Sequence, residues 1–269
     1  MRRLSFEEKD LSTKSLIAFV FSFIVVELYF VSPIYFIIKY NNRYIKKRHL
    51  PIYQIFINLL NCSTYVIIAL KGTGDFQNFL TNIIGVVLCL IVVLELWLAL
   101  SKRKNSNYIL PTFLICNCIF QLYYCIFKIG GGDKTISKAL TIIINICMYS
   151  SLNIGVYYAF KEKKADRIPL LSAILGLLSS IGWTTYSIAV ESDEKNKEKK
   201  EAKVESDSDI ITKLSNAISI IVLVIPIISY IYIAKKYKNN TITNNLHEEN
   251  SEKNKIDLEN KEEEEGNDD

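Results

Sequence analysis

The chain has 269 residues, of which 50% are hydrophobic and 22% are charged. These averages resemble those of a soluble domain, but the charge is segregated, because residues 239–269 hold 11 acids against three lysines. Apolar runs of about 20 residues, the length that a helix needs to cross a membrane, lie between the charged patches. This segmentation excludes both a soluble globular protein and a disordered one.

Seven apolar runs follow one another along the chain, each long enough to cross a bilayer as a helix. They are 15–39, 50–70, 77–100, 108–127, 139–160, 168–190 and 210–234. None alternates strictly between apolar and polar residues, which argues against barrel strands. Backbone groups in lipid must bond within their own segment, which favours helices although β-branched residues are plentiful. The first run is too long for a removable signal peptide. We therefore predict an all-α membrane protein with seven transmembrane helices.

Positive charge alternates between the predicted loops. The basic loops are 41–49, 101–107 and 161–167, with 11 Lys and Arg in total, and the intervening loops are 71–76 and 129–137, with two. Basic loops face the cytosol, so we expect the N-terminus outside and the C-terminus in the cytosol. Cations in 1–14 and 191–209 argue weakly for the opposite orientation. The plasma membrane is the expected location, with an endomembrane as the alternative.

Metal and cofactor chemistry is not expected. The six cysteines all lie inside predicted spans: Cys62, Cys89, Cys116, Cys118, Cys125 and Cys147. No extracellular disulfide framework is therefore predicted. The C-x-C at 116–118 has no histidine nearby, because His49 and His247 lie in polar segments, and no metal site is predicted there. The spans hold no catalytic cluster, so we expect no enzyme, no cofactor and no nucleic-acid partner.

The first and last thirds of the chain resemble each other. A shift of 118 positions places Pro51 on Pro169, and after a longer loop a shift of 134 places Asn82 on Asn216. This pattern predicts two parallel three-helix bundles joined by a spacer helix, a 3-1-3 plan, since one intervening helix gives both bundles the same direction. Such repeats enclose a substrate site near the membrane midplane.

The repeat divides the chain into five segments. They are 1–14, an extracellular N-terminus; 15–100, the first three-helix bundle; 101–137, the spacer helix with its flanking loops; 138–238, the second three-helix bundle; and 239–269, an acidic cytosolic tail. The tail is almost free of large apolar residues, so it cannot bury enough surface to fold and is expected to be disordered.

Several segments resemble the SWEET sugar transporters, the MtN3/saliva family. They are SPIYFIIK, LPIYQIFINLLNC, TNIIG, IGWTTYSIA and D-x6-N at 209–216. They occur in the family's order and span nearly all of the chain before the tail. The resemblance implies a uniporter that passes mono- or disaccharides down their gradient by alternating access. Members of the family often assemble as homo-oligomers.

The resemblance also implies roles for individual residues. The residues that would contact the sugar are Asn82, Asn216, Trp183 and Cys62. The hinge set is Pro33, Pro51, Pro169 and the position near Ser151 or Leu152. The outer gate is Tyr65, Tyr186 and Asp209, with Lys71 as an imperfectly aligned partner of the aspartate. Because the fourth hinge position is not proline, the fifth helix is expected to bend differently.

Two asparagines inside the membrane suit a sugar on physical grounds. An amide offers two donors and an acceptor without a charge, which would be costly to bury in lipid. Asn82 and Asn216 at equivalent places of the two repeats would hold a polyol from opposite sides. The alternative is that each amide bonds a neighbouring helix. For Trp183 the alternative is an aromatic belt at the membrane interface, which is the role expected of Trp97.

A carboxylate in the first span raises a second transport mode. Glu27 lies in the middle of an apolar run, where it is either protonated or faces a wet cavity, and it is a candidate for proton coupling. It favours a proton-coupled transporter with a PQ-loop, such as an amino-acid exporter. The residues after Pro51 and Pro169 are Ile and Leu instead of Gln, which argues against that group. A seven-helix receptor is less favoured, because receptors lack an internal repeat.

Overall fold

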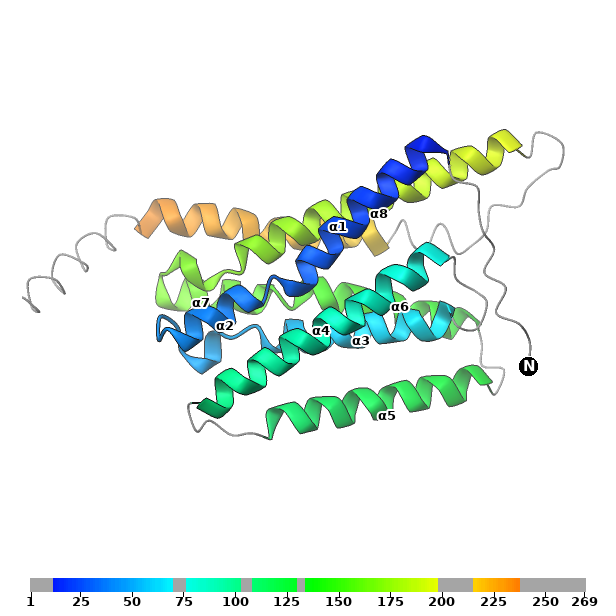
Figure 1. The fold of residues 1–269 in the computed structure, drawn as a ribbon. Helices are drawn as coiled ribbons and strands as arrows, with labels where there is room; N and C mark the ends of the chain where they lie inside the picture. The colour runs from blue at the N-terminus through cyan, green and yellow to red at the C-terminus, as the bar shows by residue number, and fades with distance from the viewer. Residues whose placement is uncertain (1–11, 70–75, 103–107, 130–133, 198–214, 238–269) are drawn as a thin grey trace, which may run out of the picture.

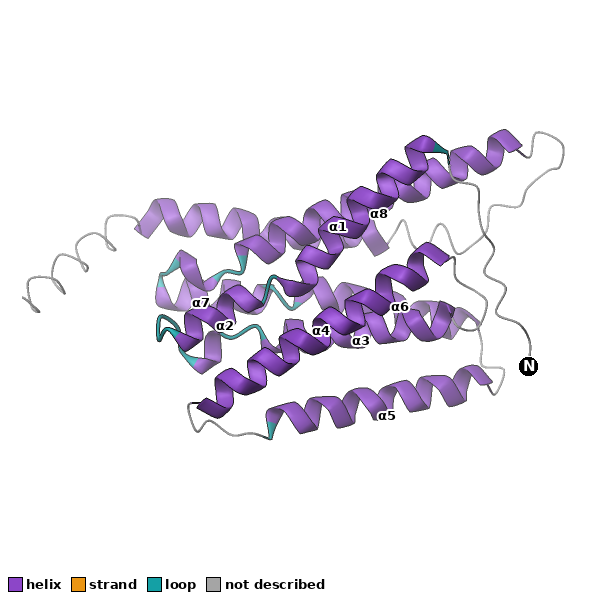
Figure 2. Cartoon of the chain, in the orientation of Figure 1, coloured by secondary structure: helices purple, strands orange, loops and turns teal. Residues whose placement is uncertain are grey.

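The fold is given by a computed structural model that describes residues 12–69, 76–102, 108–129, 134–197 and 215–237. The described elements are all helical (Figures 1 and 2). They are α1 (Thr13–Val31), α2 (Ile34–Asn41), η1 (Lys47–His49), α3 (Ile52–Ile68), α4 (Phe76–Lys102), α5 (Ile109–Ile129), α6 (Lys134–Ser150), α7 (Asn153–Glu162), η3 (Ala165–Arg167), α8 (Leu170–Lys197) and a helix over Ser215–Tyr237, here called the 215–237 helix.

The described residues contain six helical stretches long and apolar enough to cross a membrane. These are Thr13–Asn41, Lys47–Ile68, Phe76–Lys102, Ala139–Glu162, Leu170–Ser192 and Ser215–Tyr237. The fourth predicted span is also helical, as the 21-residue α5. The chain therefore has the helices of a multi-pass membrane protein. α8 runs to Lys197, past the predicted end at 190, because the polar sequence ESDEKNK continues the helix beyond the apolar run.

The outer surface of the bundle suits a lipid environment. On α1, the side chains of Leu16, Ile17, Val20, Phe21, Ile24 and Leu28 are each between 45% and 64% exposed. An apolar stripe of this extent marks contact with lipid or another apolar surface. Lys39, Lys161 and Lys236 lie over the rings of exposed tyrosines on their own helices, at 4.6, 5.8 and 5.2 Å from the ring centroids. Tyrosine and lysine together are typical of the membrane–water interface.

Two helices break at matching positions of the repeat. α1 ends before Ser32 and Pro33, and α2 continues in nearly the same direction (Figure 1). Proline lacks an amide hydrogen and so interrupts the helical ladder. α6 and α7 are separated in the same way at Ser151 and Leu152, without a proline. Serine hydroxyls bond the backbone at both breaks, from Ser32 to Tyr29 O and from Ser151 to Met148 O, each at 2.7 Å.

The turns that follow these breaks repeat as well. η1 and η3 are exactly 118 positions apart in their bounds, and each leads through an X-Pro pair into the next long helix. Arg43, two residues after the end of α2, and Lys163, directly after α7, both adopt positive φ, of 64° and 55°. A positive φ is uncommon for residues other than glycine, but the two residues are not equivalent positions of the repeat, so the two helices end in different turns. The end of the bundle that carries both turns is here called the basic end.

The two halves share one core. α1 packs along α8, and α3 packs on α4, α5 and α6; Figure 1 shows α1 antiparallel to α8 along one edge and α5 along the opposite edge. Under the shift of 118, α1–α8 and α6–α3 are equivalent contacts between the halves. The main cluster of buried apolar side chains includes Tyr29 and Leu96 from the first half and Tyr149 and Leu223 from the second.

Candidate functional site

Two of the predicted sugar contacts lie close together in the first half. Asn82 on α4 is 8% exposed, and Cys62 on α3 is fully buried. Gly85, one turn after Asn82, allows α1, α3 and α4 to meet, because a Cβ at this position would lie 2.7 Å from Phe30 Cε2 and 2.8 Å from Cys62 Sγ. The Asn82 amide nitrogen donates to Asn78 O of its own helix at 2.8 Å.

The equivalent asparagine of the second half is also buried, and the residue beside it is hydrogen-bonded to another helix. Asn216, in the first turn of the 215–237 helix, is 7% exposed. Its amide makes no hydrogen bond to another described residue, whereas Ser215 beside it accepts a bond from Asn145 Nδ2 at 2.9 Å. An asparagine amide can offer two donors and an acceptor to a polar ligand.

Trp183 belongs to an aromatic cluster between α1 and α8. Its ring lies 6.3 Å from Phe19 and 5.5 Å from Tyr186, both edge-to-face. The two helices approach most closely beside it, since a Cβ on Gly182 would lie 2.6 Å from Ser22 Oγ. The predicted sugar contact Trp183 and the predicted gate residue Tyr186 are therefore neighbours, and together with Phe19 they fill the space between α1 and α8.

The other predicted gate and hinge residues are spread over both halves. Tyr65 lies half-buried on α3, three residues after Cys62. Lys71 and Asp209 lie outside the described residues. Pro51 and Pro169 lie directly before α3 and α8, and their carbonyls accept bonds from Ile55 N at 3.1 Å and Ala173 N at 2.9 Å. Proline is well tolerated at such a helix start.

A pair of tyrosines that the sequence did not single out lies between the halves. Tyr29 on α1 and Tyr149 on α6 are 0% and 4% exposed, and their ring centroids are 5.6 Å apart. Tyr149 also packs against α8, because a Cβ on Gly176 would lie 3.2 Å from its ring. Each tyrosine adds a hydroxyl to an otherwise apolar interface. The sequence signal for this pair is weak. A tyrosine in an apolar run predicts that its ring is buried, but it does not indicate which residues the ring contacts.

Glu27 differs from its repeat mate Asn145 in how it is bonded. Asn145 is tied to the 215–237 helix through Ser215. The equivalent partner of Glu27 is Thr81, but Thr81 Oγ1 donates to Gln77 O of its own helix at 2.9 Å. Both carboxyl oxygens of Glu27 are buried and make no hydrogen bond among the described residues. An ionisable group left without a partner inside a membrane bundle is costly.

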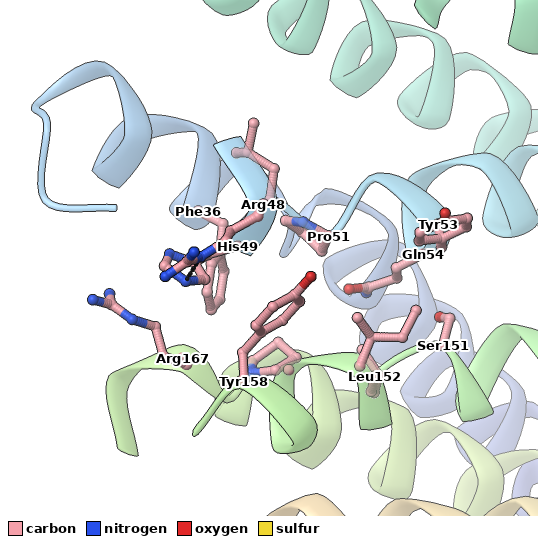
Figure 3. A pocket seen from close by; sticks show the side chains of 14 residues that line it. Phe36, Arg48, His49, Pro51, Tyr53, Gln54, Ser151, Leu152, Tyr158 and Arg167 are labelled. Atoms are coloured by element: carbon pink, nitrogen blue, oxygen red, sulfur yellow. Dashed lines mark hydrogen bonds between the residues drawn. The ribbon is translucent and has the colours of Figure 1, made fainter. Parts of the chain in front are cut away.

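A cavity lies at the basic end, between the turns of the two halves (Figure 3). Its enclosed part is about 20 Å³, enough for a water molecule but not for a sugar. Its lining consists of Phe36, Arg48, His49, Leu50, Pro51, Tyr53 and Gln54 from the first half, and Ser151, Leu152, Ile154, Gly155, Tyr158, Arg167 and Pro169 from the second. Gly155 permits the close packing of the second half, because a Cβ there would lie 2.5 Å from Pro169 Cδ.

A cluster of charged and polar groups around Glu162 joins the halves beside this cavity. Glu162 Oε1 accepts from Arg48 Nη2 at 2.6 Å and from His49 Nε2 at 2.7 Å, and Oε2 accepts from Arg167 Nε at 2.9 Å. The His49 side chain is 1% exposed and that of Arg167 9%, whereas that of Arg48 is 51% exposed. Two of the three donors come from the first half, and Glu162 itself belongs to the second.

The hydrogen bonds of His49 define its tautomer. Its Nδ1 accepts from the backbone N–H of Lys46 at 3.3 Å, so Nδ1 carries no proton. The ring proton is therefore on Nε2, which donates it to Glu162. Arg48 Nε lies 3.2 Å from the same ring nitrogen. Because both atoms then carry a proton, this contact is not a hydrogen bond. The sequence placed His49 in a polar loop and gave no sign of this contact between the halves.

Comparison with solved structures shows a similarity in fold. The structure of a eukaryotic SWEET transporter matches this chain with a TM-score of 0.59 and 16% sequence identity, over 82% of this chain and 97% of that one. No family model matches the sequence, and neither does any curated protein. The resemblance that the short motifs predicted is thus confirmed at the level of the fold. The chain has the fold of a SWEET transporter.

Proposed function

We propose that this protein is a facilitative sugar transporter of the SWEET kind, which moves mono- or disaccharides in either direction by alternating access. The observation that carries the proposal is the fold, shared over nearly the whole length of a eukaryotic SWEET transporter. The polar interior supports it: two buried asparagines at equivalent positions can bond an uncharged polyol without burying a charge.

The proposal includes a 3-1-3 arrangement with α5 as the spacer. In this arrangement α1, α2, α3 and α4 form one bundle, and α6, α7, α8 and the 215–237 helix form the other. The repeated breaks and the paired 3-10 turns support two equivalent halves. Equivalent halves allow one half to rock against the other and open a central site to each side in turn.

Sugar would lie between the halves, with Asn82 and Asn216 on its rim and Trp183 near a ring face. Cys62 would contribute a small, weakly polar wall. The hinges would be the helix breaks at Pro33 and Ser151 and the helix starts at Pro51 and Pro169, where backbone hydrogen bonds are interrupted. Tyr65, Tyr186, Asp209 and Lys71 would close the end opposite the basic one.

The basic end would face the cytosol, because it carries the Lys and Arg of the turns after α2 and α7. In the proposed orientation the N-terminus lies outside and the C-terminus lies in the cytosol, and the proposed membrane is the plasma membrane. Uptake of labelled glucose and sucrose by proteoliposomes tests the function. Saturable, downhill uptake of either sugar is expected, and uptake no faster than in protein-free liposomes would refute the proposal.

A proton-coupled transporter is the second candidate, and Glu27 favours it. A buried carboxyl without a partner can bind and release a proton during transport. We retain the uncoupled mode as the main proposal, in which collapse of the proton gradient leaves the initial sugar uptake rate nearly unchanged. A large fall in that rate that Glu27→Gln abolishes would instead assign the protein to the coupled class.

A further inference from the structure

The side chain of Gln54 is a buried polar group in the wall of the basic-end cavity. It is 1% exposed, and neither its amide nitrogen nor its amide oxygen has a hydrogen-bond partner. The Tyr29 hydroxyl lies near the amide, but the two groups do not form a hydrogen bond. Figure 3 shows the amide reaching from α3 toward Leu152 on the opposite wall. A buried amide without a partner is costly, so this one is available to a ligand or to water.

The residue equivalent to Gln54 in the other half forms a hydrogen bond, so the unpartnered amide of Gln54 is a difference between the two halves. The mate of Gln54 is Ser172 on α8, whose hydroxyl bonds Ser32 of the first half at 2.6 Å. The corresponding bond would join Gln54 to Ser150, the mate of Ser32 at the end of α6. It is not formed, because neither polar atom of the Gln54 amide has a hydrogen-bond partner. One side of the pseudo-symmetric interface is therefore closed by a hydrogen bond, and the other is left open at the cavity.

The cavity leads from the Glu162 cluster toward the interior. Arg48, His49 and Arg167 line it at one side and hold the halves together through Glu162. On α3, Gln54 is followed at four-residue intervals by Asn58, whose amide is also buried and without a partner, and by Cys62. Residues four apart lie on one helix face. These three side chains thus form a row from the basic-end cavity to the level of the predicted sugar contacts.

We propose that Gln54 binds sugar hydroxyls at the inner mouth of the transport path, and that the Glu162 cluster is the gate that closes this mouth. The inference rests on the proposed function. In the closed arrangement the cavity holds a water molecule on the amide. When the cluster separates and the halves part, a sugar hydroxyl replaces that water, because an amide can donate to and accept from a hydroxyl at once.

Thiol labelling from the basic side tests both parts. Ser151→Cys, a nearly isosteric change in the cavity wall, is introduced into a protein that keeps the buried Cys62 and Cys89 and in which Cys116, Cys118, Cys125 and Cys147 have been replaced. A membrane-impermeant thiol reagent is then applied to that side with and without glucose. We expect Glu162→Gln to increase the labelling rate about tenfold, because a neutral amide cannot replace three bonds to a carboxylate. We expect Gln54→Leu to raise the glucose concentration that protects the thiol by about threefold to tenfold.

Tyr53→Phe is the matched control, because Tyr53 lines the same cavity but is 61% exposed, and glucose protection should be unchanged. Unaltered protection in Gln54→Leu would overturn the sugar contact, and unaltered labelling in Glu162→Gln would overturn the gate. If Ser151→Cys does not fold, Ile154→Cys places the thiol in the next turn of the same wall. Sugar uptake by the same vesicles is measured separately, so its absence in the parent protein would refute the proposed function itself.

Discussion

Removal of the charge on Glu162 should destabilise the contact between the halves at the basic end. In Glu162→Gln the side chain keeps its shape, but one carboxylate oxygen is replaced by an amide NH2 group, which donates and does not accept. One oxygen is then left for three donors, which are Arg48, His49 and Arg167. At least one donor then faces another donor. Arg167 keeps only Asp166, at 3.1 Å, as an acidic partner.

The size of the effect follows from the exposure of each partner. The Arg48 side chain is 51% exposed, so its pair contributes about 0.5 kcal/mol after solvent screening. The bonds from His49 and Arg167 are shielded, and each is expected to contribute about 1 kcal/mol. The free energy of unfolding should therefore fall by roughly 2.5 kcal/mol, which for a chain of this size lowers the melting temperature by about 5–10 °C.

Thermal unfolding of the purified protein in one detergent, followed by circular dichroism, measures this shift. Asp166→Asn is the control, because Asp166 bonds the same arginine but its side chain is 47% exposed, and its loss should lower the melting temperature by less than about 2 °C. A shift in Glu162→Gln no larger than that in Asp166→Asn would refute the assignment of Glu162 as the main link between the halves.

Further substitutions test the central region. Asn82→Ala and Asn216→Ala should each abolish sugar uptake while surface expression persists, and normal uptake in both would exclude them from the site. Trp183→Ala should weaken sugar binding, measured as the half-saturation concentration, more than Trp97→Ala does, because Trp97 is 37% exposed on α4; the reverse order would remove Trp183 from the site. Gly182→Ala should lower the melting temperature by about 2–12 °C, since its Cβ would lie 2.6 Å from Ser22 Oγ and overpacking of this kind costs about 1–3 kcal/mol. An unchanged melting temperature would refute the close packing of α1 on α8 at this position.

The sequence predicted the helices well, because about 20 apolar residues in succession permit few other structures in lipid. It also located the repeat, whose period recurs in η1 and η3. The break between α6 and α7 was harder to predict, since Ser151 replaces the proline expected there. The chain still separates two helices at this point, so packing and the Ser151–Met148 bond define the break without a proline.

The side-chain partners across the halves could not be predicted. Glu162 and His49 are 113 positions apart, and both lie in polar turns that read as solvated loops. Tyr29 and Tyr149 lie in apolar runs, where periodicity indicates burial but not the neighbour. Gln54 is fully buried near the start of a span, where a polar residue is ordinary. Such contacts depend on how two helical halves dock, and docking leaves no local pattern in the sequence.

Counterflow tests the central claim most directly. Proteoliposomes preloaded with unlabelled glucose or sucrose are diluted into a trace of the labelled sugar, and label inside is followed with time. In an alternating-access uniporter, the site that has carried unlabelled sugar out returns with labelled sugar. The label inside should therefore rise above its equilibrium level and then decline. The Asn82→Ala/Asn216→Ala protein should not show this overshoot. A monotonic approach to equilibrium with both sugars, identical in the two proteins, would contradict the account.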